Sequence, residues 1–184
     1  ELWTKNGVLK GTADWGKGTP VAARPWGGVA EAGPGMTTEI EVDDLVEARA
    51  LEYLRDPARK DQPWALNASF IAPHFPLVVP ERFFNLYPLD EIDLPEIPQG
   101  HLENQHPVHQ RMRAMFGAVD FPEEQVRRAR AGYYGLITYF DEKIGRLLQV
   151  LEETGQRDNT VIVHFSDHGE MNGEHGMWRK SSMY

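Results

Sequence analysis

The stretch from residue 120 to 169 constrains the fold of this chain most strongly. Apolar side chains recur there at steps of three and four, the spacing of one face of an amphipathic helix: Val126, Ala129, Tyr133, Ile137, Phe140, Ile144, Leu147 and Leu151. A short apolar run, residues 161–165, and a polar, glycine-containing loop follow this helix. A helix, a buried strand and a polar loop in this order are typical of an α/β protein with a parallel sheet, whose ligands gather at the carboxyl ends of the strands.

The ends of the predicted helix can be read from the sequence. Asp120 and Glu123 have the spacing of a capping box, Pro122 suits the first turn of a helix, and Gly155 suits its stop. Three glycines stand inside the helix: Gly132, Gly135 and Gly145. Each costs about 1 kcal/mol relative to alanine, so we expect them to mark close packing or a local break.

The first half of the chain is less regular. Residues 1–36 hold eight of the 17 glycines and three of the five tryptophans, which predicts a long loop pinned to a core by its indole rings rather than a ligand-stacking surface. Residues 38–42 alternate as a half-buried strand would, and Asp43 or Asp44 can cap a helix that ends at Asp56.

Two further segments complete this outline. Residues 64–71 form a short apolar run bounded by turn residues, which predicts a second buried strand. Residues 88–98 are acidic and rich in proline, and we expect them to form a solvated connection.

Composition excludes several classes of function. The chain of 184 residues has 28 acidic and 19 basic residues, a net charge of −9, which disfavours non-specific nucleic-acid binding. No stretch approaches the roughly 20 apolar residues of a membrane helix, so no membrane partner is expected.

The chain has no cysteine, which excludes disulfides, thiolate zinc sites and a cysteine nucleophile within it but does not decide the compartment. The sequence leaves a homo-oligomer open. Because residue 1 is Glu and residues 179–184 carry no helix stop or polar tail, we expect the chain to be an internal piece of a longer protein.

The strongest candidate for chemistry is the run of residues 166–180. Asp167 and His168 directly follow the predicted strand and supply a carboxylate oxygen and an imidazole nitrogen. On ligand chemistry alone this pair suits Mn²⁺ or Zn²⁺ better than Ca²⁺, and two ligands cannot close a site by themselves. The alternative is a polar loop in which Asp167 caps the following turn.

Four other histidines have to be weighed beside this loop. His74 lies just past the other predicted strand, and Pro73 and Pro76 flank it and restrict the backbone that aims its imidazole. A lone histidine can equally be a surface residue. The spacings of a histidine cluster further along do not specify a metal site, and we interpret its members as surface residues: His101, His106 and His109.

Taken together, the motifs of the second half resemble the sulfatase family, within the alkaline-phosphatase-like superfamily. The resemblance spans roughly residues 64–184, and it rests on residues 133–145, 158–163, 166–170 and 173–176. Residues 127–145 and the acidic, proline-rich segment before them look most like choline-sulfatase and phosphonate monoester hydrolase-like members. The resemblance implies an α/β alkaline-phosphatase-like fold, with a largely parallel central sheet flanked by helices. With the irregular segment that composition predicts over residues 1–36, it divides the chain so that residues 37–184 are the middle portion of a catalytic domain.

The resemblance also implies roles for individual residues. Asp167 and His168 match the positions that bind a divalent metal ion, Ca²⁺ in the first place and Mn²⁺ as the alternative. Lys180 matches the lysine that contacts the sulfate oxygens, and His74 matches the histidine that stabilises or protonates the leaving group. His175 matches a common family position, to which we assign no chemical step. A metal, an ammonium and an imidazole are useful because sulfate ester cleavage leaves negative charge on the sulfuryl oxygens and the departing alkoxide.

The chain departs from the family in what it lacks. Family members carry an early Asp-Asp metal pair and a Cys- or Ser-x-Pro-x-Arg motif, whose first residue becomes formylglycine. This chain has no cysteine and no Ser-x-Pro-x-Arg, so it holds half of the metal site and no nucleophile. We therefore expect the formylglycine outside this chain, and the isolated chain to be inactive and to bind metal weakly. The leading hypothesis is a sulfuric ester hydrolase acting on a small sulfate ester. The alternatives are a phosphonate or phosphate mono- or diester hydrolase of the same superfamily, and a non-catalytic binding relative.

Overall fold

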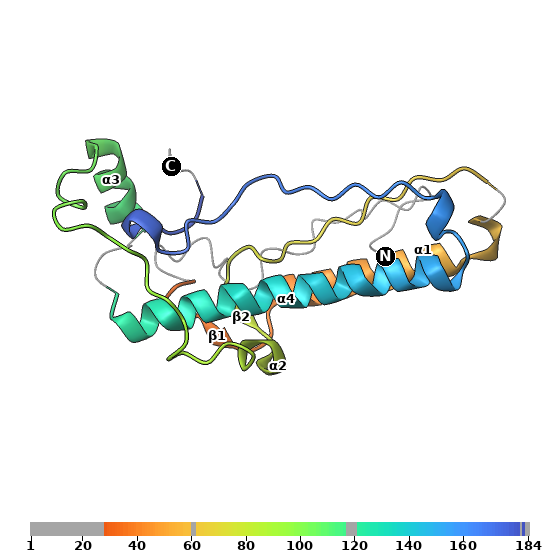
Figure 1. The fold of residues 1–184 in the computed structure, drawn as a ribbon, viewed down its shortest axis with the longest axis horizontal. Helices are drawn as coiled ribbons and strands as arrows, with labels where there is room; N and C mark the ends of the chain where they lie inside the picture. Colours follow the sequence, from red (N-terminus) through yellow and green to blue (C-terminus); the bar gives the residue numbers. More distant parts are fainter. Residues whose placement is uncertain (1–27, 60–61, 117–120, 181, 183–184) are drawn as a thin grey trace.

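Two long helices form the body of the molecule in the computed structural model, which describes residues 28–59, 62–116, 121–180 and 182. Helix α1 (Thr38–Arg55) and helix α4 (Glu123–Glu153) lie side by side and run in the same direction (Figure 1). Tyr139 donates a hydrogen bond to the Ile40 carbonyl near the start of α1, and Arg55 at its end pairs with Glu153. The tryptophan-rich start of the chain lies outside the described residues.

The predicted helix is confirmed as α4, although its beginning differs from the prediction. Pro122 is the N-cap and provides no side-chain hydrogen bond, while Asp120 lies outside the described residues. The helix ends at the C-cap Thr154, and the next residue, Gly155, adopts the left-handed conformation (φ 68°) expected of a helix stop.

The predicted strand at residues 38–42 is wrong, because α1 already begins at Thr38. Thr37 is the N-cap, and its hydroxyl accepts a hydrogen bond from the Ile40 N–H at 3.3 Å. The buried residues of α1 follow steps of three and four, the period of a helix: Ile40, Asp43, Glu47, Ala50 and Leu54. Five alternating residues are compatible with either structure, and here the cap and the longer period decide for the helix.

A small parallel sheet and a short helix pack under α4. Strand β1 (Gly33–Pro34) pairs in parallel with β2 (Val78–Val79), and helix α2 (Glu81–Phe84) follows. The core lies between these elements, α1 and α4, and its fully buried members include Ile40, Leu77 and Val79. The predicted α/β class is confirmed by this combination of a parallel sheet and helices.

Two of the three glycines of α4 mark close packing, as predicted. A Cβ atom at Gly132 would lie closer than 3.0 Å to the carbonyl oxygen of Leu77, and one at Gly135 would lie 2.9 Å from Cγ1 of Val79. Gly145 differs, since a Cβ atom there would have no neighbour within 4 Å. The glycines at 132 and 135 therefore let the helix approach Leu77, β2 and the Phe83 carbonyl of α2.

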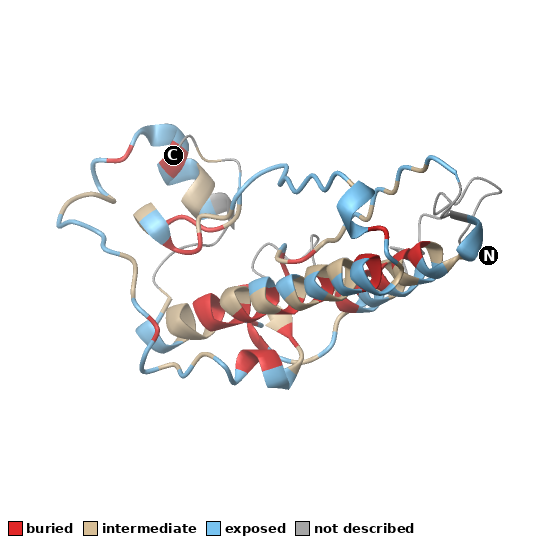
Figure 2. Ribbon diagram, turned by 45° about the vertical axis from the view of Figure 1, so that its right-hand side comes forward, coloured by how far each residue is buried: buried red, intermediate tan, exposed pale blue. Residues whose placement is uncertain are grey.

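The two predicted buried strands are not strands in the described part of the chain. Residues 64–71 and 161–165 run without regular secondary structure above α4 (Figure 1). The second run is exposed, with Val161 at 91%, and Figure 2 shows this exposure against the buried residues of α4 and α2. A strand needs a neighbour for its backbone N–H and C=O groups, and among the described residues neither run has a ladder partner.

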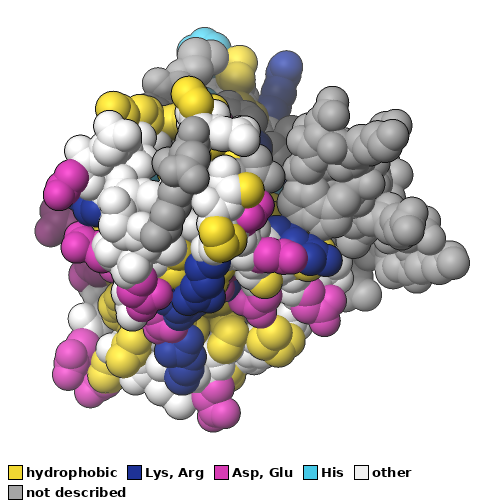
Figure 3. Space-filling view, turned by 90° about the vertical axis from the view of Figure 1, so that its right-hand side faces the viewer, with side chains coloured by type: hydrophobic (Ala, Val, Ile, Leu, Met, Phe, Trp, Pro, Cys, Tyr) yellow, Lys and Arg dark blue, Asp and Glu magenta, His cyan; other side chains and the backbone are white. Residues whose placement is uncertain are grey.

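The remaining elements are short. They comprise helix α3 (Pro107–Phe116) and the 3₁₀ turns η2 (Pro57–Arg59), η3 (Arg157–Asn159) and η4 (Glu174–Gly176). The connection at residues 88–98 has no regular structure, but it is not merely solvated, because Ile92 is buried in the core. Among the described residues, none belongs to a helix with the length and apolar character needed to cross a bilayer. Acidic and basic side chains alternate over the face seen in Figure 3.

Candidate active site

An elongated cavity of about 780 Å³ lies between α4 and the two extended runs. Its floor is the apolar stripe that the sequence predicts for α4, including Tyr133, Ile137, Phe140, Ile144 and Leu147. Residues 66–74 and 160–170 form its walls. The stripe that the periodicity detects is thus the cavity face of α4, whereas its buried face carries Gly132, Gly135 and Tyr139.

The four predicted site residues all line this cavity: His74, Asp167, His168 and Lys180. The ammonium group of Lys180 lies 2.8 Å from Nε2 of His168 and 3.5 Å from Nε2 of His74. The two imidazole rings stand edge to face, with centroids 6.1 Å apart. Residues separated by up to 106 positions are therefore brought within contact distance of one lysine.

The backbone sets the orientation of both imidazoles. Nδ1 of His74 lies 2.8 Å from the carbonyl oxygen of Phe75, and Nδ1 of His168 lies 2.9 Å from that of Gly169. A carbonyl can only accept, so each Nδ1 carries a proton, and each Nε2 faces the ammonium group of Lys180. A backbone carbonyl on the far nitrogen is also how ligating histidines are held at metal centres.

Asp167 and His168 fit adjacent positions around one cation. Oδ2 of Asp167 lies 3.3 Å from Nε2 of His168, and the Asp167 side chain is 82% exposed. Two ligands at right angles, each about 2.1–2.4 Å from an ion, lie roughly 3.0–3.4 Å apart. The geometry therefore suits this pair as a partial ligand set, although the described residues contain no group of three or more His, Asp or Glu side chains that could hold a metal ion.

Glu170 organises the loop that carries Lys180. Its carboxylate accepts hydrogen bonds from the backbone N–H groups of Asn172 and Arg179, the residue before Lys180. Burial raises the pKa of Glu170, and these two N–H groups oppose that rise. Arg179 has a left-handed backbone (φ 69°), and its guanidinium lies 4.9 Å from the ring centre of Phe75.

A buried arginine fixes the same loop from α4. Arg130 donates to the Asn172 carbonyl at 2.9 Å and pairs with Glu174 at 2.9 Å and with Asp93 at 2.8 Å. The sequence analysis missed both Arg130 and Glu170. A charged residue directly between two alanines, Ala129 and Ala131, is the signal that could have found the arginine.

The surface interpretation of the remaining histidines needs correction. His109 is buried, at 7% exposure, and His101 is half-buried, so only His106 is exposed. Nε2 of His101 lies 3.3 Å from Nδ1 of His175, whose backbone carbonyl accepts a hydrogen bond from Gln105. The short spacing of these histidines gave no indication that His101 packs against the loop between His168 and Lys180.

Comparison with known proteins gives a consistent result. The family model described as Sulfatase matches residues 24–184. A choline-sulfatase of Rhizobium meliloti (strain 1021) is 38% identical over 164 residues, which cover 85% of this chain and 31% of that protein. An arylsulfatase of Clostridium perfringens (strain 13 / Type A) is 36% identical over 167 residues, covering 88% of this chain and 32% of that protein. The chain thus spans about a third of the length of these curated relatives.

Solved structures extend the comparison to the fold. A phosphonate monoester hydrolase from Silicibacter pomeroyi matches with a TM-score of 0.67 and 31% identity, over 80% of this chain and 30% of that one. The phosphonate monoester hydrolase of Agrobacterium radiobacter matches with a TM-score of 0.71 over 86% of this chain and 33% of that one, and at 24% identity it shows the fold alone. The fold is that of the alkaline-phosphatase-like sulfatases and phosphonate monoester hydrolases.

Proposed function

The chain belongs to the sulfatase family, and on that premise we propose that the protein of which it forms part hydrolyses sulfate esters of small molecules. The observation that supports this proposal most directly is the cluster of Lys180, His74 and His168 around one point of the cavity. A cation and two imidazoles face the same point, an arrangement suited to stabilising charge that develops on a sulfuryl group and its leaving oxygen.

Each residue has a distinct task in this proposal. Asp167 and Nε2 of His168 contribute two ligands to a divalent cation, Ca²⁺ or Mn²⁺, which would replace Lys180 as the partner of this Nε2, and other ligands come from outside this chain. The bound cation would neutralise negative charge on the ester. Lys180 contacts the sulfuryl oxygens, and His74 donates a proton from Nε2 to the leaving oxygen as its bond to sulfur breaks. The formylglycine nucleophile implied by the family resemblance also lies outside this chain.

Two substrate classes and one non-catalytic alternative remain to be distinguished. The choline-sulfatase of Rhizobium meliloti supports choline O-sulfate as the first substrate to test. The likeness to the phosphonate monoester hydrolase from Silicibacter pomeroyi supports a second candidate function, hydrolysis of a phosphonate or phosphate ester by the same residues. A non-catalytic binding protein is the third alternative, and it predicts no turnover of either class.

The test uses the full-length protein with three substrates: choline O-sulfate, an aryl sulfate and an aryl phosphonate monoester. Replacing Lys180 with Ala should lower kcat on the best substrate by about 10²–10³, the usual loss for one preorganised charge stabiliser. Metal binding should be retained, because Lys180 is not a ligand. Arg157→Ala is the control, since it removes an exposed cation outside the cavity lining and should leave kcat unchanged.

The outcomes separate the three candidates. The preferred substrate class distinguishes a sulfatase from a phosphonate hydrolase. Near-full kcat in Lys180→Ala would show that the assigned role of the lysine is wrong, and absence of turnover on all three substrates would favour the binding protein.

A further inference from the structure

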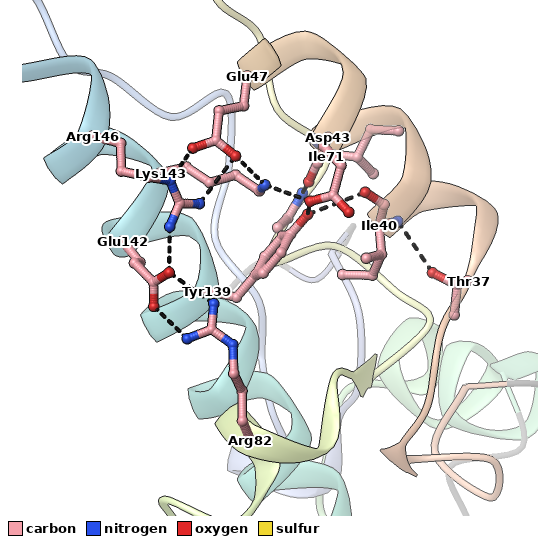
Figure 4. A network of polar contacts seen from close by, with 12 residues as sticks. Thr37, Ile40, Asp43, Glu47, Ile71, Arg82, Tyr139, Glu142, Lys143 and Arg146 are labelled. Atoms are coloured by element: carbon pink, nitrogen blue, oxygen red, sulfur yellow. Dashed lines mark hydrogen bonds and ion pairs between the residues drawn. The ribbon is translucent and has the colours of Figure 1, made fainter. Parts of the chain in front are cut away.

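Asp43 is a completely buried carboxylate whose two oxygens both bind the backbone just before His74. Oδ1 accepts a hydrogen bond from the Ile71 N–H at 2.7 Å, and Oδ2 accepts one from the Ala72 N–H at 2.9 Å. The side chain is 0% exposed and comes from the second turn of α1, 28 positions earlier in the sequence (Figure 4). The carboxylate therefore has no contact with solvent.

The bonded backbone leads directly to the imidazole. The N–H of His74 donates to the Ile71 carbonyl at 2.9 Å, so residues 71–74 form one turn. Pro73 lies inside this turn and restricts its backbone further. Two charge-assisted hydrogen bonds at Ile71 and Ala72 therefore set the position from which the His74 ring extends into the cavity.

This arrangement differs from ordinary packing, because a buried carboxylate is costly for the fold. An isolated charge transferred from water to an apolar interior loses its hydration, and only well-formed hydrogen bonds offset that loss. Burial accordingly raises the pKa of Asp43, and the N–H groups of Ile71 and Ala72 oppose the rise. An apolar residue would fill the same space without this desolvation cost. The carboxylate is therefore explained by its hydrogen bonds to the backbone of Ile71 and Ala72.

The neighbouring acid shows that Asp43 is not simply part of the ion network between the helices. Asp44 is 52% exposed and binds Nζ of Lys143 at 2.6 Å and the hydroxyl of Tyr139 at 2.9 Å. It has no hydrogen bond to residues 71–72. Asp43 and Asp44 thus serve different partners, although they have the same side chain and adjacent positions.

We propose that Asp43 is a positioning residue for His74, which holds the imidazole at the leaving oxygen by fixing the backbone of Ile71 and Ala72. This inference rests on the proposed function of His74. Its chemical consequence is specific: loss of Asp43 should impair assistance to the leaving group and spare the other parts of the site. A residue that only stabilises the fold would affect all substrates equally.

The experiment compares Asp43→Asn with Asp44→Asn in the full-length protein, with the wild type and His74→Ala alongside. Two sulfate esters are used, 4-nitrophenyl sulfate with a good leaving group and phenyl sulfate with a poor one. General-acid assistance matters most for the poor leaving group, and displacement of a catalytic group by about 1 Å can cost about 100-fold. In Asp43→Asn we expect kcat to fall about 10- to 100-fold on phenyl sulfate and less than about 3-fold on 4-nitrophenyl sulfate, with KM nearly unchanged. In Asp44→Asn we expect the two substrates to change by the same small factor.

Hydrogen exchange provides a readout that does not depend on turnover. Asn retains one acceptor and places an N–H₂ group at the other, so the amides of residues 71–72 should exchange faster in Asp43→Asn than in Asp44→Asn. If Asp43→Asn does not fold, Asp43→Glu keeps the charge and both acceptors but displaces the bonded backbone, and the same substrate dependence is expected.

The failures of the two proposals can be told apart. If His74→Ala affects both substrates equally, the leaving-group role of His74 is wrong and the inference is overturned with it. If His74→Ala shows the leaving-group dependence and Asp43→Asn does not, only the positioning role of Asp43 is overturned. Unchanged exchange at residues 71–72 in Asp43→Asn would overturn it as well.

Discussion

Replacing Gly132 with Ala should destabilise the protein, whereas the same change at Gly145 should stabilise it. Both residues lie inside α4, so each replacement removes the backbone-entropy cost of a helical glycine, a gain of about 1 kcal/mol. At Gly145 the new methyl group meets nothing within 4 Å, and the whole gain remains. At Gly132 the methyl group would lie closer than 3.0 Å to the Leu77 carbonyl oxygen, a backbone atom that cannot rotate away.

The size of the effect follows from this contact. Overpacking in a well-filled interior costs about 1–3 kcal/mol, and contact with rigid backbone places Gly132→Ala near the upper value. Subtracting the helix gain of about 1 kcal/mol leaves a net loss of about 2 kcal/mol, so the two variants should differ by about 3 kcal/mol in the free energy of unfolding. Urea unfolding followed by circular dichroism at 222 nm measures this difference, provided the m-values agree. Equal stability of the two variants would refute the close approach of α4 to Leu77.

Two further predictions concern the ion network between α1 and α4 (Figure 4). Lys143 is 1% exposed between Asp44 and Glu47, so Lys143→Ala should lower the free energy of unfolding by about 3–5 kcal/mol, measured in urea. Arg82→Ala, at the exposed end of the network, should lower it by less than about 1 kcal/mol. Comparable losses in the two variants would show that burial does not govern the strength of these ion pairs. Hydrogen bonds from Arg82 and Arg146 lower the pKa of Glu142 to about 2 from 4.5, so its contribution to stability is complete above about pH 4.5 and is lost as the pH falls toward 2. Glu142→Gln should therefore flatten the stability profile between pH 5 and pH 2 in thermal unfolding, and an unchanged slope would contradict the lowered pKa.

Local periodicity predicted secondary structure correctly where an element is determined by residues close together in the chain. The apolar steps of three and four from Val126 to Leu151 predicted α4, and Gly155 predicted its stop, because both signals depend only on neighbours in the chain. The same reasoning failed at residues 38–42, where five alternating residues suit either structure. It also failed at residues 161–165, because an apolar run becomes a strand only beside a partner that local sequence does not reveal.

The sequence pointed to four residues that the fold brings to one cavity, but not to the residues that support them, and the chemical roles of the four stay predictions. Polar residues just past two apolar runs, and the family resemblance, pointed to His74, Asp167, His168 and Lys180, which line one cavity. Asp43 and Arg130 could not be assigned in this way, since their partners lie 28 to 44 positions away in the sequence. The local sequence shows each of them only as a charged residue on a helix and does not reveal its partners.

Two faces of α4 serve the candidate site: one packs against the chain that carries His74, and the other lines the cavity. On one face Gly132 brings the helix against the Leu77 carbonyl, three residues after His74, while Asp43 holds the chain at Ile71, three residues before it. The His74 loop is therefore fixed at both ends, by a close approach on one side and by a buried carboxylate on the other. On the opposite face Tyr133 lines the cavity into which the imidazole projects. Helix α4 thus anchors the loop that carries His74 and forms the floor beneath the same side chain, so the packing of the helix and the geometry of the candidate site depend on one another.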